Sequence, residues 1–328
     1  MKASTTGLQR FRAVWKYWLW LALVLLSCCL IVACQGDSAS KSGQAQLRSD
    51  CRQIHHDLGQ ICVPPDPDAV ITLEEITFAD AIALGVSPIG TAIYEDVSID
   101  YLKDTDSPPP ASVGKSEQAN LEAILSLKPD LIVGIVFSGE AVFDQLSQIA
   151  PTALGSWVGY SSWREYFDFV AQVLDKKAEA AAVWKAYDQR VSEIKAALDR
   201  QSQKKKVTFV YAYGSDMTID AENSFVGSIF ADLGLSQPDY PPTEDGTIAL
   251  SEELLPMLDA DILFVGAYSA DARETLSVWE RKPLWQQLKA VQAEQVYTVD
   301  TDIWRGENPI AAQRVIDELF EHFVKESA

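Results

Sequence analysis

The sequence predicts an α/β protein with two lobes, each built on a central, mainly parallel sheet, and one long α-helix that joins them. Three observations lead to this prediction. Helical segments alternate with short, wholly apolar strands, the pattern of parallel sheets covered on both faces. The order of these elements repeats in the two halves of the chain. A helical segment without glycine or proline separates the halves.

The first 34 residues form a targeting segment that we expect to be absent from the mature fold. A basic head precedes an uncharged apolar run over residues 18–33, which is shorter than the ~20 residues of a comfortable membrane span. Ala33 directly before Cys34 resembles a lipobox. We therefore expect signal cleavage and lipidation of Cys34, which would hold the chain on the outer face of the cell membrane. Cys28 is a poorer lipidation candidate, and an uncleaved anchor is the alternative.

The mature chain is strongly acidic. The complete sequence has 27 basic and 47 acidic residues and a formal charge of −20. The targeting segment holds four basic and no acidic residues, so its removal brings the formal charge to −24. This balance argues against a nucleic-acid partner, and it would repel an anionic ligand unless local arginines compensate.

Residues 35–67 are expected to form a flexible tether and a disulfide loop. Residues 35–49 are mainly Ser, Gly, Gln and Ala, which bury too little surface to become ordered. Cys51 and Cys62 are the mature cysteines besides Cys34, and in an oxidising compartment we expect them to be bonded. Two free thiols are the alternative. Three prolines precede the first predicted strand, so folding is expected to start near Asp68.

The N-terminal lobe is predicted over residues 68–175, with strands at 69–73 and 131–136 and helices at 78–84 and 120–127. Residues 162–206 then show apolar side chains at helical spacing. Asp175 with Glu179 indicates a helix restart, which predicts a linker over residues 176–203. Its helix runs from about Lys176 to Gln201, about 26 residues and 39 Å. One more covering helix is the alternative, but the position between the repeats favours a bridge.

The C-terminal lobe is predicted over residues 204–328, with strands at 207–211, 262–265 and 296–299 and helices at 226–233 and 252–258. One segment in each half places a glutamate eight residues before an aspartate at a helix-to-strand turn. These pairs are Glu122 with Asp130 and Glu253 with Asp261. The shared spacing, together with the shared order of elements, indicates two pseudo-equivalent lobes.

Several segments resemble the ferric-siderophore and ferric-citrate binding proteins of ABC importers, a group within a wider family that includes cobalamin and haem binders. They span nearly the whole mature chain in the expected order. They are CRQIHHDLGQICVPP (51–65), LGVSPIG (84–90), NLEAILSLKPDLIV (120–133), IAPT (149–152), PLWQQL (283–288) and VYTVD (296–300). The fourteen-residue segment from 120 to 133 is the most specific of them.

The resemblance implies two Rossmann-like lobes, a ligand cleft between them, and a small hinge movement on binding. It further implies a monomeric, non-enzymatic lipoprotein on the periplasmic face, which carries a ferric siderophore or ferric citrate to an ABC permease dimer in the inner membrane. In this family an acidic residue on each lobe docks into arginines of the permease. The matching positions are Glu122 and Glu253, with Glu252 as a possible substitute for Glu253.

Ligands of open α/β sheets lie beyond the carboxyl ends of the strands, where this sequence has aromatic residues and one arginine. Trp304 and Arg305 are the leading candidates: the family commonly has Trp at this place, and Arg305 could clamp an anionic chelate. Further candidates are Tyr94, Ser138, Trp157, Tyr211, Tyr213 and Tyr268, with Phe137 and Ser215 beside them. Core packing is the alternative for Trp157 and Tyr211, and Arg164, Arg273 and Arg281 are weaker clamp candidates.

The sequence gives no support to catalysis or to a protein-bound cofactor. It has no Gly-x-Ser-x-Gly elbow, and Gly114-Lys115-Ser116 lacks the other features of a phosphate loop. Three mature histidines are too few for a direct metal site. Haem, cobalamin or a bare ferric ion held by tyrosines remain alternative ligands, and a sensor or interaction lipoprotein without transport remains the alternative function. The identity of the chelate stays open.

Overall fold

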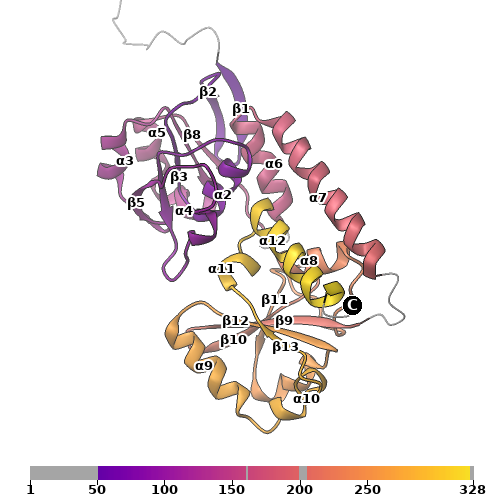
Figure 1. Ribbon diagram of the computed structural model, residues 1–328. Coiled ribbons are helices and arrows are strands. Elements are labelled where there is room, and N and C mark those ends of the chain that lie inside the picture. The colour runs from indigo at the N-terminus through magenta and orange to yellow at the C-terminus, as the bar shows by residue number, and fades with distance from the viewer. Residues whose placement is uncertain (1–50, 160–161, 199–204, 326–328) are drawn as a thin grey trace, which may run out of the picture. The chain divides into compact units, whose positions relative to one another are not determined.

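The structure, a computed structural model, describes residues 51–159, 162–198 and 205–325. It contains two mixed, mainly parallel sheets with helices packed on them and a long helix beside both, as Figure 1 shows. The predicted α/β fold class is confirmed. Cys34 and the rest of the targeting segment lie outside the described residues. Within the described ranges, none of the helices is both long and apolar enough to cross a membrane.

The N-terminal sheet has six strands, of which only the edge strand β6 is antiparallel to its neighbour. The order is β6 (Gln118–Ala119), β5 (Ala111–Lys115), β4 (Gly90–Ile93), β3 (Val70–Thr72), β7 (Leu131–Ile135) and β8 (Thr152–Gly155). The helical elements are α2 (Glu75–Ala83), η1 (Asp100–Leu102), α3 (Leu121–Leu127), α4 (Val136–Gly139), η2 (Glu140–Val142), α5 (Phe143–Ile149) and α6 (Trp163–Val173).

Apolar residues on both faces of β3 and β7 account for the layering of this lobe. Val70 and Val133 pack in one cluster with residues of α6, whereas Ile71 and Ile132 pack in another with residues of α3 and α5. Successive side chains of a strand point to opposite faces. A continuous apolar run therefore buries both faces, and helices must cover both.

The C-terminal sheet has five strands. The order is β11 (Thr247–Leu250), β10 (Asp216–Asp220), β9 (Val207–Tyr213), β12 (Ile262–Ala267) and β13 (Val296–Thr298). Strands β9, β12 and β13 pair in parallel, and β10 pairs antiparallel with both β9 and β11. The helical elements are α8 (Phe225–Asp232), η4 (Glu252–Leu258), α9 (Ala270–Glu280), η5 (Trp285–Gln287), α10 (Lys289–Gln292), α11 (Thr301–Trp304), α12 (Pro309–Phe320) and η6 (Glu321–Lys325).

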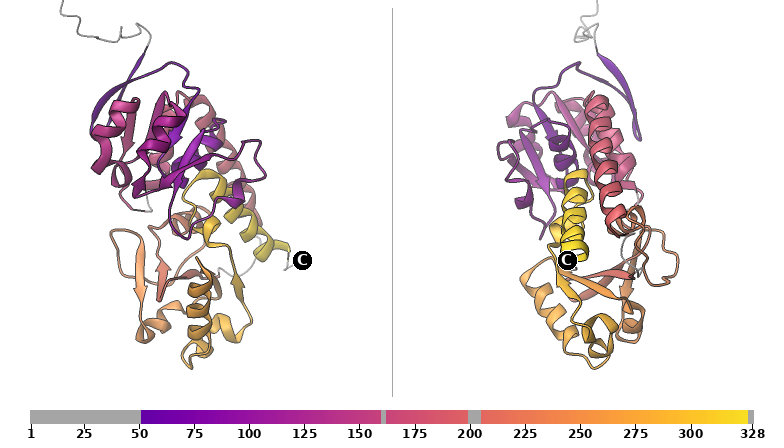
Figure 2. Two further views of the ribbon diagram at one scale, coloured as in Figure 1. Left: turned by 90° about the vertical axis from the view of Figure 1, so that its left-hand side faces the viewer. Right: turned by 45° about the vertical axis from the view of Figure 1, so that its right-hand side comes forward.

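The long helix α7 (Lys177–Leu198) has 22 residues, about 33 Å at the helical rise, and runs alongside both sheets in Figures 1 and 2. It is separated from α6 at Asp175, whose φ of 60° lies in the left-handed region. The Lys176 amide donates to the Ala171 carbonyl at 2.8 Å and closes α6. The predicted restart thus falls at Asp175, while residues 199–204 lie outside the described ranges.

Helix α12 lies between the lobes rather than inside the C-terminal one. It packs against α2 of the N-terminal lobe as well as α7 and α8, and Figure 2 shows it beside α7. The Arg314 guanidinium donates to the Tyr101 carbonyl at 2.5 Å, and the Asn308 side-chain amide donates to the Tyr101 hydroxyl at 2.8 Å. Helix α12 is therefore a second connection between the lobes.

Order begins before Asp68, contrary to our expectation. Strands β1 (Arg52–His56) and β2 (Gly59–Val63) form an antiparallel hairpin whose Ile54 and Val63 are buried in the N-terminal core. The Arg52 guanidinium donates to the last carbonyls of α6, at 3.0 and 2.8 Å. The hairpin has few inward-facing apolar residues, so its signal in the sequence is weak.

Cys51 and Cys62 are joined by a disulfide in the structure, with their Cα atoms 5.4 Å apart. We expect both cysteines of the secreted chain to resist alkylation until a reductant is added, as measured by intact mass. The Cys51→Ser/Cys62→Ser variant should lose up to about 3 kcal/mol, the value typical of a short closed loop. Alkylation of both thiols without reductant would show that they are free.

Candidate functional site

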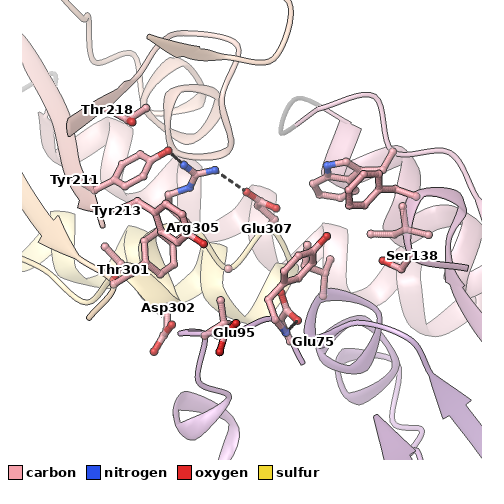
Figure 3. A pocket seen from close by; sticks show the side chains of 18 of the residues that line it. Glu75, Glu95, Ser138, Tyr211, Tyr213, Thr218, Thr301, Asp302, Arg305 and Glu307 are labelled. Carbon is pink, nitrogen blue, oxygen red and sulfur yellow. Dashed lines mark hydrogen bonds and ion pairs between the residues drawn. The ribbon is translucent and has the colours of Figure 1, made fainter. Parts of the chain in front are cut away.

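A pocket of about 360 Å³ lies between the two lobes, and its lining comes from segments that follow strands of both sheets. In the N-terminal lobe Tyr94 follows β4, Ser138 follows β7 and Trp157 follows β8. In the C-terminal lobe Tyr268 follows β12 and Arg305 follows β13. Each sheet thus presents its carboxyl end to the pocket, as expected for open α/β sheets. Figure 3 shows the lining.

Seven of the eight predicted ligand-binding residues line this pocket. They are Tyr94, Ser138, Trp157, Tyr211, Tyr213, Tyr268 and Arg305. Tyr101 and Phe137 add further rings, and Phe137 is 69% exposed. Aromatic side chains bring large apolar area and defined geometry, which suits a flat or rounded chelate surface.

Three tyrosines form one aromatic cluster on the C-terminal side. Tyr268 meets Tyr211 and Tyr213 edge to face, with ring centroids 5.8 and 5.6 Å away. Tyr211 and Tyr213 are two positions apart on β9, so both project from the same face of the strand. Tyr211 is buried whereas Tyr213 is 54% exposed. Tyr213 is therefore the member most accessible to a ligand.

Trp304 does not line the pocket, which corrects our leading prediction. Its ring is fully buried in the C-terminal core, with the ring centroids of Phe264 and Phe209 at 4.5 and 5.2 Å. The indole N–H donates to Glu318 at 2.6 Å. Consecutive residues of a helical turn point about 100° apart, so Arg305 can face the pocket while Trp304 faces the core.

Arg305 lines the pocket, and two acidic side chains lie close to its guanidinium. Its buried guanidinium lies 3.6 Å from Asp220 and 3.5 Å from Glu307. It also donates to the Tyr211 hydroxyl and lies over the Tyr211 ring, 4.4 Å from the centroid. These neighbours compete with a ligand anion for the guanidinium, and the role of Arg305 as an anion clamp stays a prediction. Arg164, a weaker clamp candidate, is paired with Asp232 at 2.6 Å and does not line the pocket.

The turn between α11 and α12 positions Arg305 and Glu307. Gly306 allows close packing, because a Cβ there would lie 2.5 Å from the Ala311 Cβ. Glu307 has a φ of 54°, a strained conformation for a residue with a side chain. The Asn308 side chain accepts from the Ala311 amide at 3.0 Å and caps α12. This cap and the close packing hold Glu307 in the pocket.

Five acidic residues line the pocket, and sequence reasoning missed all of them: Glu75, Glu95, Asp216, Asp302 and Glu307. Burial raises the pKa of Glu307 to about 8 although Arg305 opposes the shift. Burial also raises the pKa of Asp302 to about 6, against the hydrogen bond that its carboxylate accepts from the Ser98 amide at 3.1 Å. Glu75 lies three residues after the end of β3, and Asp302 lies four residues after the end of β13. The rule used for the aromatic residues therefore also applies to them.

Glu74 lies fully buried next to Glu75, outside the lining. Its carboxylate accepts from the Thr77 hydroxyl at 2.7 Å and from the Ile135 amide at 3.1 Å. Burial raises the pKa of Glu74 to about 8 from its ordinary 4.5. Between pH 4.5 and pH 8 the Glu74 carboxyl group holds its proton in the folded protein but not in the unfolded chain. Its contribution to stability is therefore complete below pH 4.5 and is lost as the pH rises through 8.

We therefore expect the melting temperature to fall by about 5 °C or more between pH 5 and pH 8. Glu74→Gln should flatten this dependence, because a neutral amide replaces the protonated acid. Some slope should remain, since the pKa values of Glu307 and Asp302 are raised too. Scanning calorimetry across this range tests the expectation, with exposed Glu165→Gln as the control. Equal slopes in wild type and Glu74→Gln would contradict it.

The two predicted docking residues occupy matching places in the lobes. Glu122 lies in the first turn of α3 before β7, and Glu253 lies in the first turn of η4 before β12. Both are exposed. Glu252 forms an ion pair with Lys282 at 2.6 Å, which favours Glu253 as the docking candidate.

A family model described as Periplasmic binding protein matches residues 70–303. The chain belongs to this family. Its members are substrate-binding proteins and not enzymes, in agreement with the sequence. This periplasmic binding protein is 31% identical over 320 residues to a probable siderophore-binding lipoprotein, YfiY, of Bacillus subtilis (strain 168), covering 93% of this chain and 98% of the relative. It is 32% identical to the Fe(3+)-citrate-binding protein YfmC of the same organism, covering 86% and 89%.

Solved structures show the same fold. The crystal structure of Staphylococcus aureus SirA complexed with staphyloferrin B matches with a TM-score of 0.71 and 28% identity, covering 83% of this periplasmic binding protein and 98% of SirA. Bacillus subtilis FeuA complexed with ferri-bacillibactin matches with a TM-score of 0.70 and 25% identity, covering 84% and 98%. Both likenesses extend over both lobes.

Proposed function

We propose that this protein is the extracytoplasmic substrate-binding lipoprotein of an ABC importer, which captures a ferric chelate and delivers it to the permease. The observation that carries the proposal is the aromatic pocket between the lobes, lined from the carboxyl ends of both sheets. A ligand held there contacts both lobes at once, so binding can favour one lobe arrangement, which a permease can recognise.

The relatives support iron as the cargo. One is named a probable siderophore-binding lipoprotein, another a Fe(3+)-citrate-binding protein, and the matching SirA and FeuA structures hold staphyloferrin B and ferri-bacillibactin. In a chelate the iron sites are already filled. Rings and a few polar groups therefore suffice to bind it.

A bare ferric ion is a weaker candidate. No cluster of three or more His, Cys, Asp or Glu residues with metal-site geometry occurs among the described residues. Burial and nearby glutamates raise the pKa of Tyr94, which opposes the phenolate that iron would need. The pocket volume of about 360 Å³ is at the small end for ligand sites, which favours a compact chelate over haem or cobalamin.

Tryptophan fluorescence of the soluble chain from Gln35 onward tests the proposal, because Trp157 lines the pocket. The titrants are ferric citrate, a ferric trihydroxamate, a ferric tricatecholate, haem and cobalamin. We expect saturable quenching by a ferric chelate with a Kd below about 1 μM. Trp157→Phe should remove most of this signal, while calorimetry still detects binding. If no compound binds, a non-transport lipoprotein becomes the better interpretation.

A further inference from the structure

The pocket between the lobes has an excess of negative charge. Its five acidic lining residues come from both lobes, and among the described lining residues Arg305 is the only cation. Arg305 is itself held by Asp220 and Glu307. Ferric citrate is an anion, so such a lining opposes the ligand for which one relative is named.

The excess persists in every protonation state of the buried groups. Burial raises the pKa values of Glu75, Asp220 and Glu307, and in the least acidic case all three are protonated at neutral pH. Asp302, with a pKa of about 6, and the exposed Asp216 then still oppose the single charge of Arg305. Ionisation of any buried acid only adds negative charge.

Glu95, the fifth acidic lining residue, does not change the sign of the pocket's net charge. The Glu95 carboxylate pairs with Lys115 at 2.8 Å, so the two charges offset each other at the rim. In this least acidic case the net charge of the pocket at neutral pH is therefore still negative, by about one unit. Figure 3 shows that Asp302, Glu95 and Glu75 lie along one side of the pocket.

The tyrosine cluster on the C-terminal side suits a cation. Arg305 already lies over the Tyr211 ring, which shows that a cation is accommodated against this cluster. Tyr213 extends the cluster toward solvent, and Asp216 follows it by three residues across the turn into β10. A cationic ligand group near Tyr213 would thus have a ring and a carboxylate close by.

We propose that the pocket selects ferric chelates by charge: it takes a cationic or neutral complex, of the trihydroxamate type, in preference to an anionic one, and Asp216 and Asp302 determine this preference. This inference rests on the proposed function, because it assigns the class of chelate to the same pocket. Opposite charges at short range in a partly buried site attract strongly enough to change affinity about tenfold per unit of ligand charge.

A matched ligand series isolates charge from iron geometry. In ferric desferrioxamine B three hydroxamates neutralise the iron, and a terminal ammonium gives one positive charge. Acetylation of the amine gives a neutral complex, and succinylation gives an anion, while the iron coordination is unchanged. The Kd of each is measured by calorimetry and by tryptophan quenching at low salt, alongside ferric citrate and a ferric tricatecholate.

We expect the cationic complex to bind tightest and the anionic one weakest, with about tenfold between successive members. Asp216→Asn/Asp302→Asn should reduce the spread to less than about threefold. The amide oxygen introduced by Asp302→Asn can still accept the hydrogen bond from the Ser98 amide, so the lobe contact is retained. The control is Asp144→Asn/Asp188→Asn, which removes two exposed carboxylates elsewhere and should leave the spread unchanged.

Salt provides a second test that needs no variant. Raising the salt concentration from 50 to 500 mM should weaken the cationic complex and strengthen the anionic one. Equal affinities, or tightest binding of the anionic member or of ferric citrate, would overturn charge selection while leaving the proposed function intact. Failure of every ferric chelate to bind would overturn the proposed function itself.

Discussion

Trp304→Ala should lower the free energy of unfolding by about 3–5 kcal/mol, as expected when a large aromatic side chain is removed from a core. The indole is fully buried against Phe264 and Phe209, so its removal leaves a cavity beside these rings. Its loss also leaves the carboxylate of Glu318 without the indole donor, in a place where burial already raises the pKa of that group. Urea denaturation followed by circular dichroism measures the effect.

Two controls distinguish a core role from ligand contact. Trp304→Phe keeps most of the ring packing and should recover at least half of the lost stability. At temperatures where the variants are folded, both should bind the chelate within about twofold of wild type. Trp157→Ala should lose affinity for the chelate but less stability than Trp304→Ala, because Trp157 is half-buried in the pocket lining. A large loss of affinity in Trp304→Phe would restore Trp304 as a binding residue.

The fold was predictable where burial imposes a clear pattern. Strands β3, β7, β9 and β12 are apolar on both faces, and each appeared in the sequence as a short uninterrupted run. The break at Asp175 was also visible, since a charged residue interrupts two helical patterns. The hairpin β1–β2 and the strands β10 and β11 are partly exposed, so their sequences lack such runs and were not predicted.

The site was predictable by position but not by charge. Knowing which strands are parallel was enough to place seven of eight candidate side chains in one pocket. The spacing of residues does not show whether a side chain points into the pocket or into the core. Trp304 and Arg305 were therefore both predicted to contact the ligand. The acidic partners of Arg305 come from β10 and from the turn before α12, and neither segment was placed by the sequence. The two acidic neighbours of Arg305 could therefore not be foreseen.

Charge reversal at the two docking glutamates should abolish iron uptake while leaving chelate binding intact. Glu122 and Glu253 are both exposed, at matching turns of the two lobes, and neither lines the pocket. If each faces arginines of a permease subunit, Glu122→Lys with Glu253→Lys replaces two attractions by two repulsions. Like charges opposed across an interface cost several kcal/mol, so transport should fall by more than tenfold.

The measurement compares uptake of a radioactive iron chelate in cells with the Kd of the purified variants. Glu165→Lys with Glu274→Lys is the matched control, because it makes the same change of charge at one exposed position in each lobe. This control should transport normally, which separates docking from a general effect of net charge. Exposed Leu125 and Leu254 lie near the two glutamates and would add apolar area to the same contact. Normal uptake in the Glu122/Glu253 variant would exclude these glutamates as docking residues.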